Sequence, residues 1–376
     1  ECKLQFCGVV GLADPPRDSV KQDVETCIKA GVRVVMITGD NGITASAIAR
    51  QIGMADSDKI ITGDEIDKMS QEELKEKIKN VSIFSRVIPE HKMRIVQAFK
   101  ANGEIVAMTG DGVNDAPALK YADIGIAMGK RGSEVAREAA DLILLDDNFS
   151  TIVDTIKDGR RIYDNIKRAF GYVIVIHIPI AFAALLAPLL GINPTCLLLL
   201  PVHVVLLELV IDPTCSIVLE RQPAETDIME RPPRKMNEKL IDINSLTKSL
   251  FQGFAIFGAA FGTYLTFLEQ YPDNAALART MGLTIMFISN MLLVHVNSSE
   301  SELAIRSILR LRGDKVIAAV NIGVILGLII MLYTPFADVL KLAPLTWQEI
   351  ILAVGIACAS VLWYEIVKLV RLGMTK

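Results

Sequence analysis

The sequence predicts two parts of different class, an α/β domain followed by an all-α bundle of transmembrane helices. Up to about Arg168, short apolar runs alternate with charge-rich amphipathic stretches. Beyond that residue, long apolar runs alternate with short charged connectors, and 51% of the 376 residues are hydrophobic. A chain of this length exceeds one compact domain. We therefore expect an α/β domain over residues 1–150, a stalk over residues 151–168 and a transmembrane domain with six helices over residues 169–376.

The α/β domain is predicted from brief apolar runs that have the character of buried parallel strands. The candidate strands are Val32–Ile37, Ile105–Met108, Ile124–Ala127 and Leu142–Leu145. The amphipathic candidate helices are Val20–Ala30, Ala45–Ile52, Gln71–Lys79, Glu90–Ala101 and Ser133–Ala139. This alternation predicts a doubly wound parallel sheet. In such sheets, ligands bind beyond the carboxyl ends of the strands.

Two of the predicted strands end in the same three residue types. Thr38, Gly39 and Asp40 follow the first strand, and Thr109–Asp115 follows the second. Glycine lets the backbone turn tightly and approach a phosphate, and Asp and Asn oxygens suit Mg²⁺. Matching strand ends therefore predict phosphate chemistry at this edge. We interpret a third Thr-Gly-Asp run, Thr62–Asp64, as a turn.

Lys92 lies in sequence between these two strands and is a candidate partner for a phosphate. It is near the start of the predicted helix Glu90–Ala101, where a cation gains nothing from the helix dipole. An isolated lysine is usually a solvated surface residue. Its place between two phosphate-type strand ends favours a role in the site.

Six apolar segments approach the length of about 20 residues that a spanning helix needs. They are Ala169–Leu190, Thr195–Leu219, Ser249–Leu268, Met281–Val296, Val316–Tyr333 and Trp347–Leu369. The connectors after the second and fourth segments and the C-terminal tail are rich in Lys and Arg. The alternate connectors Gly191–Pro194, Glu269–Arg279 and Thr334–Thr346 are short or nearly uncharged. The positive-inside rule therefore predicts that the soluble domain and the C-terminus share the cytoplasm.

Two carboxylates lie inside the second predicted span. Glu208 and Asp212 are four residues apart, and so on one helix face, and Asp212 directly precedes Pro213. A proline inside a helix frees a backbone carbonyl and kinks the helix. Because intramembrane charge is rare and usually functional, we expect a cation site here. Pairing of these carboxylates inside the bundle is the structural alternative.

Composition argues against several other classes of protein. The net charge of −4 provides no basic face for nucleic acid. The six cysteines include no Cys-x-x-Cys pair, so the sequence indicates neither a zinc site nor a disulfide framework. The residues from Leu4 to Val10 already have the character of a strand in mid-domain. We therefore expect a C-terminal fragment of a longer protein.

Taken together, these motifs resemble those of the P-type cation-transporting ATPases, closest to the calcium-pump-like subfamily, which includes bacterial members. The matching segments, in order, are Asp14–Arg17, Met36–Asn41, Pro89 with Lys92, Thr109–Leu119, Asp146–Phe149 and Asp227–Arg234. The resemblance implies a haloacid-dehalogenase-like fold for the phosphorylation domain. It also implies a pump that uses ATP and Mg²⁺ to form and hydrolyse an aspartyl phosphate.

The resemblance assigns roles at the two strand ends. Thr38 would hydrogen-bond the phosphoryl group, Lys92 would neutralise its oxygens, and Asp40 would help to position nucleotide and metal. Gly39, between Thr38 and Asp40, is included among the catalytic residues. The implied Mg²⁺ residues are Asp111, Asn114 and Asp115, and the implied hinge residues are Asp14 and Arg17. Phosphoryl transfer depends mostly on positioning and charge neutralisation, which these residue types supply.

The resemblance also places a transport site in the membrane. The oxygen-ligand positions of the first span fall on His177 and Ile180, and those of the second include Glu208 and Asp212. Asn290 in the fourth span lies near a further ligand position. His177 is open to three interpretations, as a ligand, a proton carrier or a packed polar residue. The transported ion is then Ca²⁺ or another small cation, with a single-ion or proton-exchanging site.

One departure from the family pattern limits the activity of the chain itself. The acceptor string Asp-Lys-Thr-Gly-Thr does not occur, so we expect the isolated chain to form no phosphoenzyme. The leading hypothesis is part of an ATP-driven cation pump in the lipid bilayer of the plasma (inner) membrane. The alternatives are a truncated, non-catalytic membrane protein that binds Mg²⁺ or a partner and, more remotely, a channel or secondary transporter fused to a phosphatase-like domain.

Overall fold

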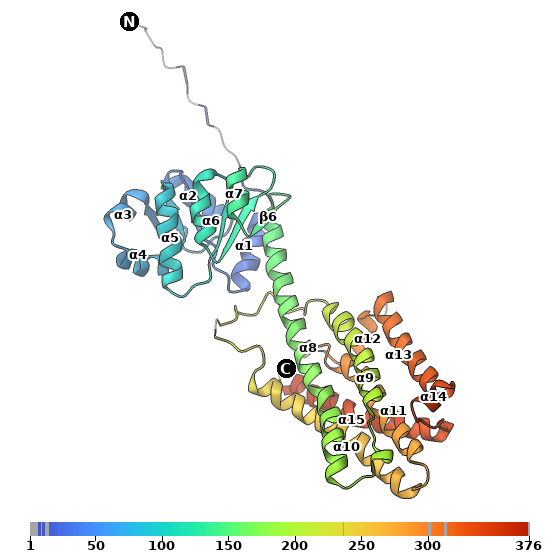
Figure 1. Cartoon of the computed structure of the whole chain (residues 1–376). Helices are drawn as coiled ribbons and strands as arrows, with labels where there is room; N and C mark the ends of the chain where they lie inside the picture. The colour runs from blue at the N-terminus through green and yellow to red at the C-terminus, as the bar shows by residue number, and fades with distance from the viewer. Residues whose placement is uncertain are drawn as a thin grey trace. The chain divides into compact units, whose positions relative to one another are not determined.

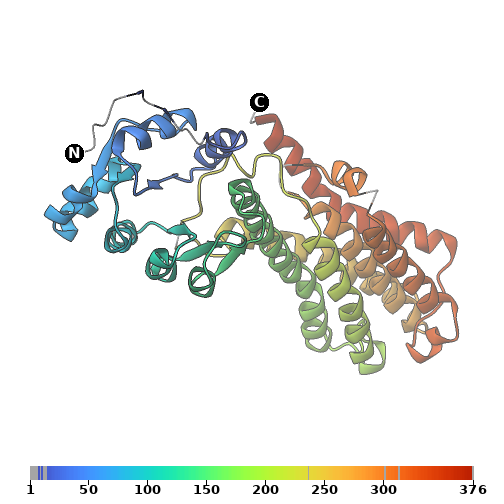
Figure 2. The same cartoon turned by 90° about the horizontal axis from the view of Figure 1, so that it is seen from above.

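The computed structural model describes residues 7–8, 10–11, 15–235, 237–299, 302–311 and 314–374. The chain forms two compact units (Figures 1 and 2). The α/β unit contains the residues up to Asp158 together with Thr226–Arg234. The helical unit contains Gly159–Glu225 and the residues from Lys235 onward.

The α/β unit alternates short strands with helices, as the sequence predicts. Its strands are β1 (Met36–Ile37), β2 (Ile60–Thr62), β3 (Ile83–Ser85), β4 (Ala107–Gly110), β5 (Ile124–Met128) and β6 (Leu142–Leu144). Its helices are α1 (Val20–Lys29), α2 (Gly42–Gln51), α3 (Gly63–Lys68), α4 (Gln71–Lys77), α5 (Pro89–Ala101), α6 (Ala116–Tyr121) and α7 (Glu134–Ala139), with 3₁₀ turns at Ile78–Asn80 and Val113–Asp115 (Figure 1).

All the described strand pairings are parallel, in two three-stranded sheets. The strand orders are β1-β3-β2 and β4-β5-β6. Both β1 and β4, the strands that precede Thr-Gly-Asp runs, are edge strands of their sheets. Ile37 and Val106 pack in the same two hydrophobic clusters, so the regions of β1 and β4 share core neighbours. The predicted parallel α/β class is confirmed, and the described strands form two separate hydrogen-bonded sheets.

The interpretation of Thr62–Asp64 as a turn is wrong. Thr62 ends β2 and caps α3, accepting a hydrogen bond from Glu65 N while the Glu65 carboxylate accepts one from Thr62 N. Gly63 is required by packing, because a Cβ there would lie 2.2 Å from the Arg86 carbonyl oxygen. This Thr-Gly-Asp run is therefore a capping box.

The helical unit begins within the long helix α8 (Phe149–Leu189). The other helices are α9 (Pro201–Pro213), α10 (Ile243–Gln270), α11 (Ala275–Val296), α12 (Ala304–Leu311), α13 (Lys315–Tyr333), α14 (Phe336–Val339) and α15 (Trp347–Met374), with a 3₁₀ turn at Pro194–Cys196. In the described part of the chain, six segments are long and apolar enough to cross a membrane. They begin at Phe149, Pro194, Ile243, Ala275, Lys315 and Trp347. The last five each contain one of the predicted spans, and the first contains all but the final residue of the predicted Ala169–Leu190.

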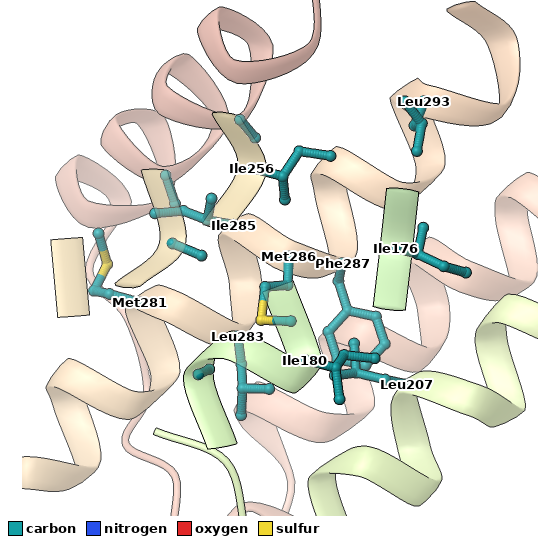
Figure 3. Close-up of a cluster of buried hydrophobic side chains, with 14 of the residues drawn as sticks. Ile176, Ile180, Leu207, Ile256, Met281, Leu283, Ile285, Met286, Phe287 and Leu293 are labelled. Carbon is teal, nitrogen blue, oxygen red and sulfur yellow. The ribbon is translucent and has the colours of Figure 1, made fainter. Parts of the chain in front are cut away.

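Helix α11 forms the centre of the helical core. Met281, Leu283 and Ile285 are each at most 1% exposed. Figure 3 shows side chains of α11 packed among Ile176 and Ile180 of α8, Leu207 of α9 and Ile256 of α10. This helix is buried on nearly all sides, and most of its buried side chains are apolar.

The second candidate span changes its helical form at a proline. The α-helix α9 ends at Pro213, and Thr214–Leu219 continues as a π-helix. Proline has no N–H to donate to the carbonyl four residues earlier, which is that of Leu209. The Thr214 hydroxyl donates to the Val210 carbonyl at 2.6 Å. Single-turn π segments are frequent at functional sites.

Candidate functional sites

The first Thr-Gly-Asp edge is held against the end of β3. Thr38 N donates to Phe84 O at 2.9 Å, and Val87 N donates to Thr38 O at 3.1 Å. The Thr38 hydroxyl accepts a hydrogen bond from Asp40 N at 3.0 Å. Gly39 and Asp40 are exposed, so the end of this strand presents backbone and carboxylate groups to solvent.

Lys92 and Asp115 form an ion pair that joins α5 to the end of β4. Asp115 is only 5% exposed. Its other oxygen accepts hydrogen bonds from Asp111 N at 3.2 Å and Gly112 N at 3.1 Å. A Cβ at Gly110 would lie 2.5 Å from the Asp115 Cβ, so only glycine fits there. Asp115 is thus a buried acceptor that shapes the loop.

Asp111 and Asn114 have exposed side chains beside this buried pair. The Asp111 carbonyl accepts a hydrogen bond from Ser133 N at 2.7 Å, which fixes the backbone of the loop. Within the described residues, no group of three or more His, Cys, Asp or Glu side chains is placed to hold a metal. An exposed carboxylate with a neighbouring amide fits Mg²⁺, which usually keeps waters and phosphate oxygens as its other ligands.

Of the two expected hinge residues, Arg17 is described and Asp14 lies outside the described residues. Arg17 Nη1 donates to the Asp147 carbonyl at 2.6 Å. Burial opposes ionisation of Asp147, but hydrogen bonds from the backbone N–H groups of Lys130 and Arg131 outweigh it and lower the pKa of Asp147. Arg17 is therefore attached to a carboxylate-stabilised turn of the same unit.

In the helical unit, the structure brings together two of the four expected cation residues. His177 Nε2 of α8 lies 3.3 Å from Glu208 Oε1 of α9. The other ring nitrogen, Nδ1, lies 2.7 Å from the Val173 carbonyl oxygen. The two side chains are 48% and 37% exposed within this chain. A ring nitrogen and a carboxylate oxygen thus face each other between two candidate spans.

The other two expected cation residues, Asp212 and Asn290, have no described contact with His177 or Glu208. Asp212 follows Glu208 by one turn of α9, and its side chain lies outside the described residues. Asn290 is buried in α11, with 4% of its surface exposed. Among the described contacts, no hydrogen bond joins Asn290 to His177 or Glu208.

Arg279 is a polar anchor that the sequence analysis missed. The sequence places it at the end of a nearly uncharged connector, Glu269–Arg279, but it lies inside α11 and is 2% exposed. Its guanidinium donates to the carbonyl oxygens of Thr195 (2.7 Å), Leu197 (2.8 Å) and Lys341 (2.7 Å). A lone arginine at the start of an apolar run is the only signal in the sequence, and it does not identify these partners.

The fold defines a class of protein: a chain with a parallel α/β unit and six segments long and apolar enough to cross a membrane. Comparison with known families agrees. The haloacid dehalogenase-like hydrolase pattern matches residues 1–123, and a second such pattern matches residues 92–156. The pattern of the C-terminus of cation-transporting ATPases matches residues 196–370.

Curated relatives match along nearly the whole chain. The calcium-transporting ATPase of Bacillus subtilis is 37% identical over 358 residues, which is 95% of this chain and 40% of that protein. Calcium-transporting ATPase 1 of Bacillus cereus is 38% identical, over 99% of this chain and 43% of that protein. Human calcium-transporting ATPase type 2C member 1 is 33% identical, over 100% of this chain and 40% of that protein. The chain belongs to the P-type calcium-transporting ATPase family, and it spans about two fifths of the length of these relatives.

Proposed function

We propose that the intact protein is an ATP-driven cation pump that couples formation and hydrolysis of an aspartyl phosphate to cation transport across a membrane. The observation that carries the proposal is the ion pair of Lys92 with Asp115 beside the exposed Asp111. This arrangement lies at the carboxyl end of a parallel strand, where such sheets bind ligands. The same chain contains six candidate membrane spans.

The residues of the α/β unit have separate roles in this proposal. Asp111 and Asn114 are the Mg²⁺ ligands, and Asp115 holds their loop in place. Lys92 neutralises phosphoryl oxygens when substrate is present, while the backbone and hydroxyl of Thr38 orient them. Bound Mg²⁺ would supply neutralisation of charge on the phosphate of ATP. Gly39 and Asp40 leave room for the nucleotide at the exposed end of β1, and Arg17 forms part of the hinge with Asp14.

The membrane residues His177, Glu208, Asp212 and Asn290 form the transport site in this proposal. Glu208 and Asp212 supply oxygens on α9, next to the π-helical turn. The positive-inside rule supports a cytoplasmic α/β unit and C-terminus. The proposed location is the plasma (inner) membrane. The transported ion is a small cation, as the printed names of the relatives suggest for those proteins.

The phosphoryl-transfer assignment is tested by cation-stimulated ATP hydrolysis of the intact protein. Asp111→Asn should lower the rate by at least about a hundredfold, because it removes a charged Mg²⁺ ligand. Asp64→Asn is the matched control, since Asp64 ends the Thr-Gly-Asp run that caps α3. Equal rates in the two variants would remove the basis for the proposal.

A second candidate, a non-catalytic membrane protein that binds Mg²⁺, is favoured by the lack of an Asp-Lys-Thr-Gly-Thr string in this chain. Acid trapping after incubation of the isolated chain with labelled ATP and Mg²⁺ should show no acyl phosphate under either candidate. The intact protein should form one under the pump proposal alone.

A further inference from the structure

We propose that helix α12 (Ala304–Leu311) lies along the membrane surface and binds anionic lipid headgroups. The helix belongs to the connector between the fourth and fifth candidate spans (Figure 1). Ile305 and Leu309 are 66% and 60% exposed, and Arg306 is exposed beside them. None of these residues belongs to either candidate site. They form a surface with an apolar part and a basic part.

Hydrogen bonds hold the start of α12 at the level where two candidate spans end. The Ala304 N–H donates to Glu365 Oε2 of α15 at 2.7 Å. Glu365 lies within the last two turns of the sixth candidate span, which ends at Arg371. In the same turn of α15, Lys368 Nζ donates to the carbonyl of Val296, the last residue of the fourth span, at 2.5 Å. The start of α12 is therefore fixed beside the ends of spans four and six.

The other end of α12 is held close to the membrane by a short connection. The helix ends at Leu311, and the fifth candidate span begins at Lys315. A chain of four residues reaches at most about 14 Å. The hydrocarbon core of a bilayer is about 30 Å thick within a total of about 40–45 Å, so each polar interface is about 5–8 Å deep. Both ends of α12 are thus tethered near this interface, and we place the helix along it.

The exposed apolar residues of α12 fit the boundary between headgroups and acyl chains. Ile305 and Leu309 are four residues apart, so they are neighbours on one face of the helix. Contact of this face with water is unfavourable, and immersion among acyl chains removes it from water. An amphipathic helix that lies in an interface buries its apolar face in this way.

The charge of the same segment favours anionic lipid. Four basic residues lie between the start of α12 and the start of the next span: Arg306, Arg310, Arg312 and Lys315. The only acidic residue in this stretch of the sequence is Asp314, and its carboxylate is paired with Arg221 Nε at 2.9 Å. Basic residues next to a span attract anionic headgroups, and their long apolar stems let the charge reach the headgroups while the helix lies deeper. The partner is therefore a negatively charged phospholipid.

The test reconstitutes the full chain in phosphatidylcholine vesicles, with and without phosphatidylglycerol. A Leu309→Trp variant reports the environment of α12 after subtraction of the parent spectrum, to which Trp347 and Trp363 contribute. We expect brominated lipids to quench the added tryptophan by about twofold or more in anionic vesicles, and less in neutral ones. Ile43→Trp, at an apolar position of α2 that is 80% exposed, is the matched control and should not be quenched.

Charge variants test the selectivity for anionic lipid. In the Leu309→Trp background, Arg306→Gln combined with Arg310→Gln should abolish the difference between the two kinds of vesicle. Arg50→Gln, at an exposed position of α2, should leave the difference unchanged. In the parent protein, amide hydrogen exchange of residues 304–311 should slow by about tenfold or more in anionic vesicles relative to neutral ones. This last measurement does not depend on the folding of any variant.

Three outcomes would contradict the proposal. Quenching that is equal in the two kinds of vesicle and unchanged by the arginine substitutions would overturn the preference for anionic lipid. An unquenched tryptophan with blue-shifted emission would mean that a protein surface, and not lipid, covers α12. An unquenched tryptophan with the emission of a water-exposed side chain would mean that the helix is solvated.

Discussion

The two candidate sites differ in how their charges are satisfied. In the α/β unit, the Asp115 carboxylate is paired with Lys92 and accepts two backbone hydrogen bonds, all from its own chain. In the helical unit, the Glu208 carboxylate is 37% exposed and has one described partner, the half-exposed His177 ring, whose Nε2 lies 3.3 Å from Oε1. The first carboxylate thus acts as part of the fold, and the second is available as a ligand. Burial and local partners, rather than residue type, separate the two roles.

The largest effect should come from breaking the satisfied pair. Lys92→Met leaves Asp115, which is 5% exposed, without its cation. The free energy of unfolding of the α/β unit should fall by about 3–5 kcal/mol, as for other broken buried pairs. Chemical denaturation measures it. Lys100→Met is the control, because its pair with Asp123 is partly exposed and should contribute under about 1 kcal/mol. Equal losses of unfolding free energy in the Lys92→Met and Lys100→Met variants would show that the buried pair stabilises the unit no more than the exposed one.

The second effect tests the close packing that seats Asp115. Gly110→Ala places a Cβ 2.5 Å from the Asp115 Cβ, so the loop must shift. We expect a loss of about 1–3 kcal/mol in the free energy of unfolding, the usual cost of overpacking. Gly159→Ala, at a helical position with no atom near the added Cβ, should be neutral or slightly stabilising. A neutral Gly110→Ala variant would show that the loop is not packed as described.

A third prediction concerns Asp242, an exposed residue whose carboxylate caps the start of α10. Hydrogen bonds from Ser245, assisted by Lys167, lower the pKa of Asp242 to about 2. Because the folded pKa lies below the usual value of 3.8, the stabilisation is present above about pH 4 and is lost as the pH falls towards 2. Hydrogen exchange at the start of α10 should accelerate over this range. Asp242→Asn should show no such acceleration.

The smallest effect should come from His177→Gln in metal-free buffer. The side chains of His177 and Glu208 are 48% and 37% exposed, so the free energy of unfolding should change by under about 0.5 kcal/mol. Thermal unfolding in detergent measures this. A loss of several kcal/mol would mean that the contact of His177 with Glu208 stabilises the fold as strongly as the pair of Lys92 with Asp115. The two carboxylates would then not differ in their contribution to the fold.

Much of the architecture follows from local sequence patterns. The apolar runs that predict β5 and β6 are strands, and each of the six predicted spans lies, to within one residue, inside a segment long and apolar enough to cross a membrane. Short strands are harder to predict from the sequence. Residues of β2 and β3 lie among capping and charged residues and span three residues each, too few for an alternation to appear.

The contacts of the sites could be predicted only in part. Thr38 and Thr109 are recognisable because they follow apolar strands, and Lys92 because it lies between them in the sequence. The burial of Asp115 depends on the fold that brings α5 to the end of β4, which no local pattern encodes. The same holds for Arg279, whose three carbonyl partners come from two distant connectors.

The most direct test of the account is cation-dependent phosphorylation of the intact protein, measured by acid trapping with labelled ATP and Mg²⁺. We expect phosphoenzyme to form in the parent only when the transported cation is present. Glu208→Gln should raise the cation concentration that is required by at least tenfold, because it removes the charge of a ligand. If Glu208→Gln required the same cation concentration as the parent, the assignment of the Glu208 carboxylate as a ligand of the transported ion would be wrong.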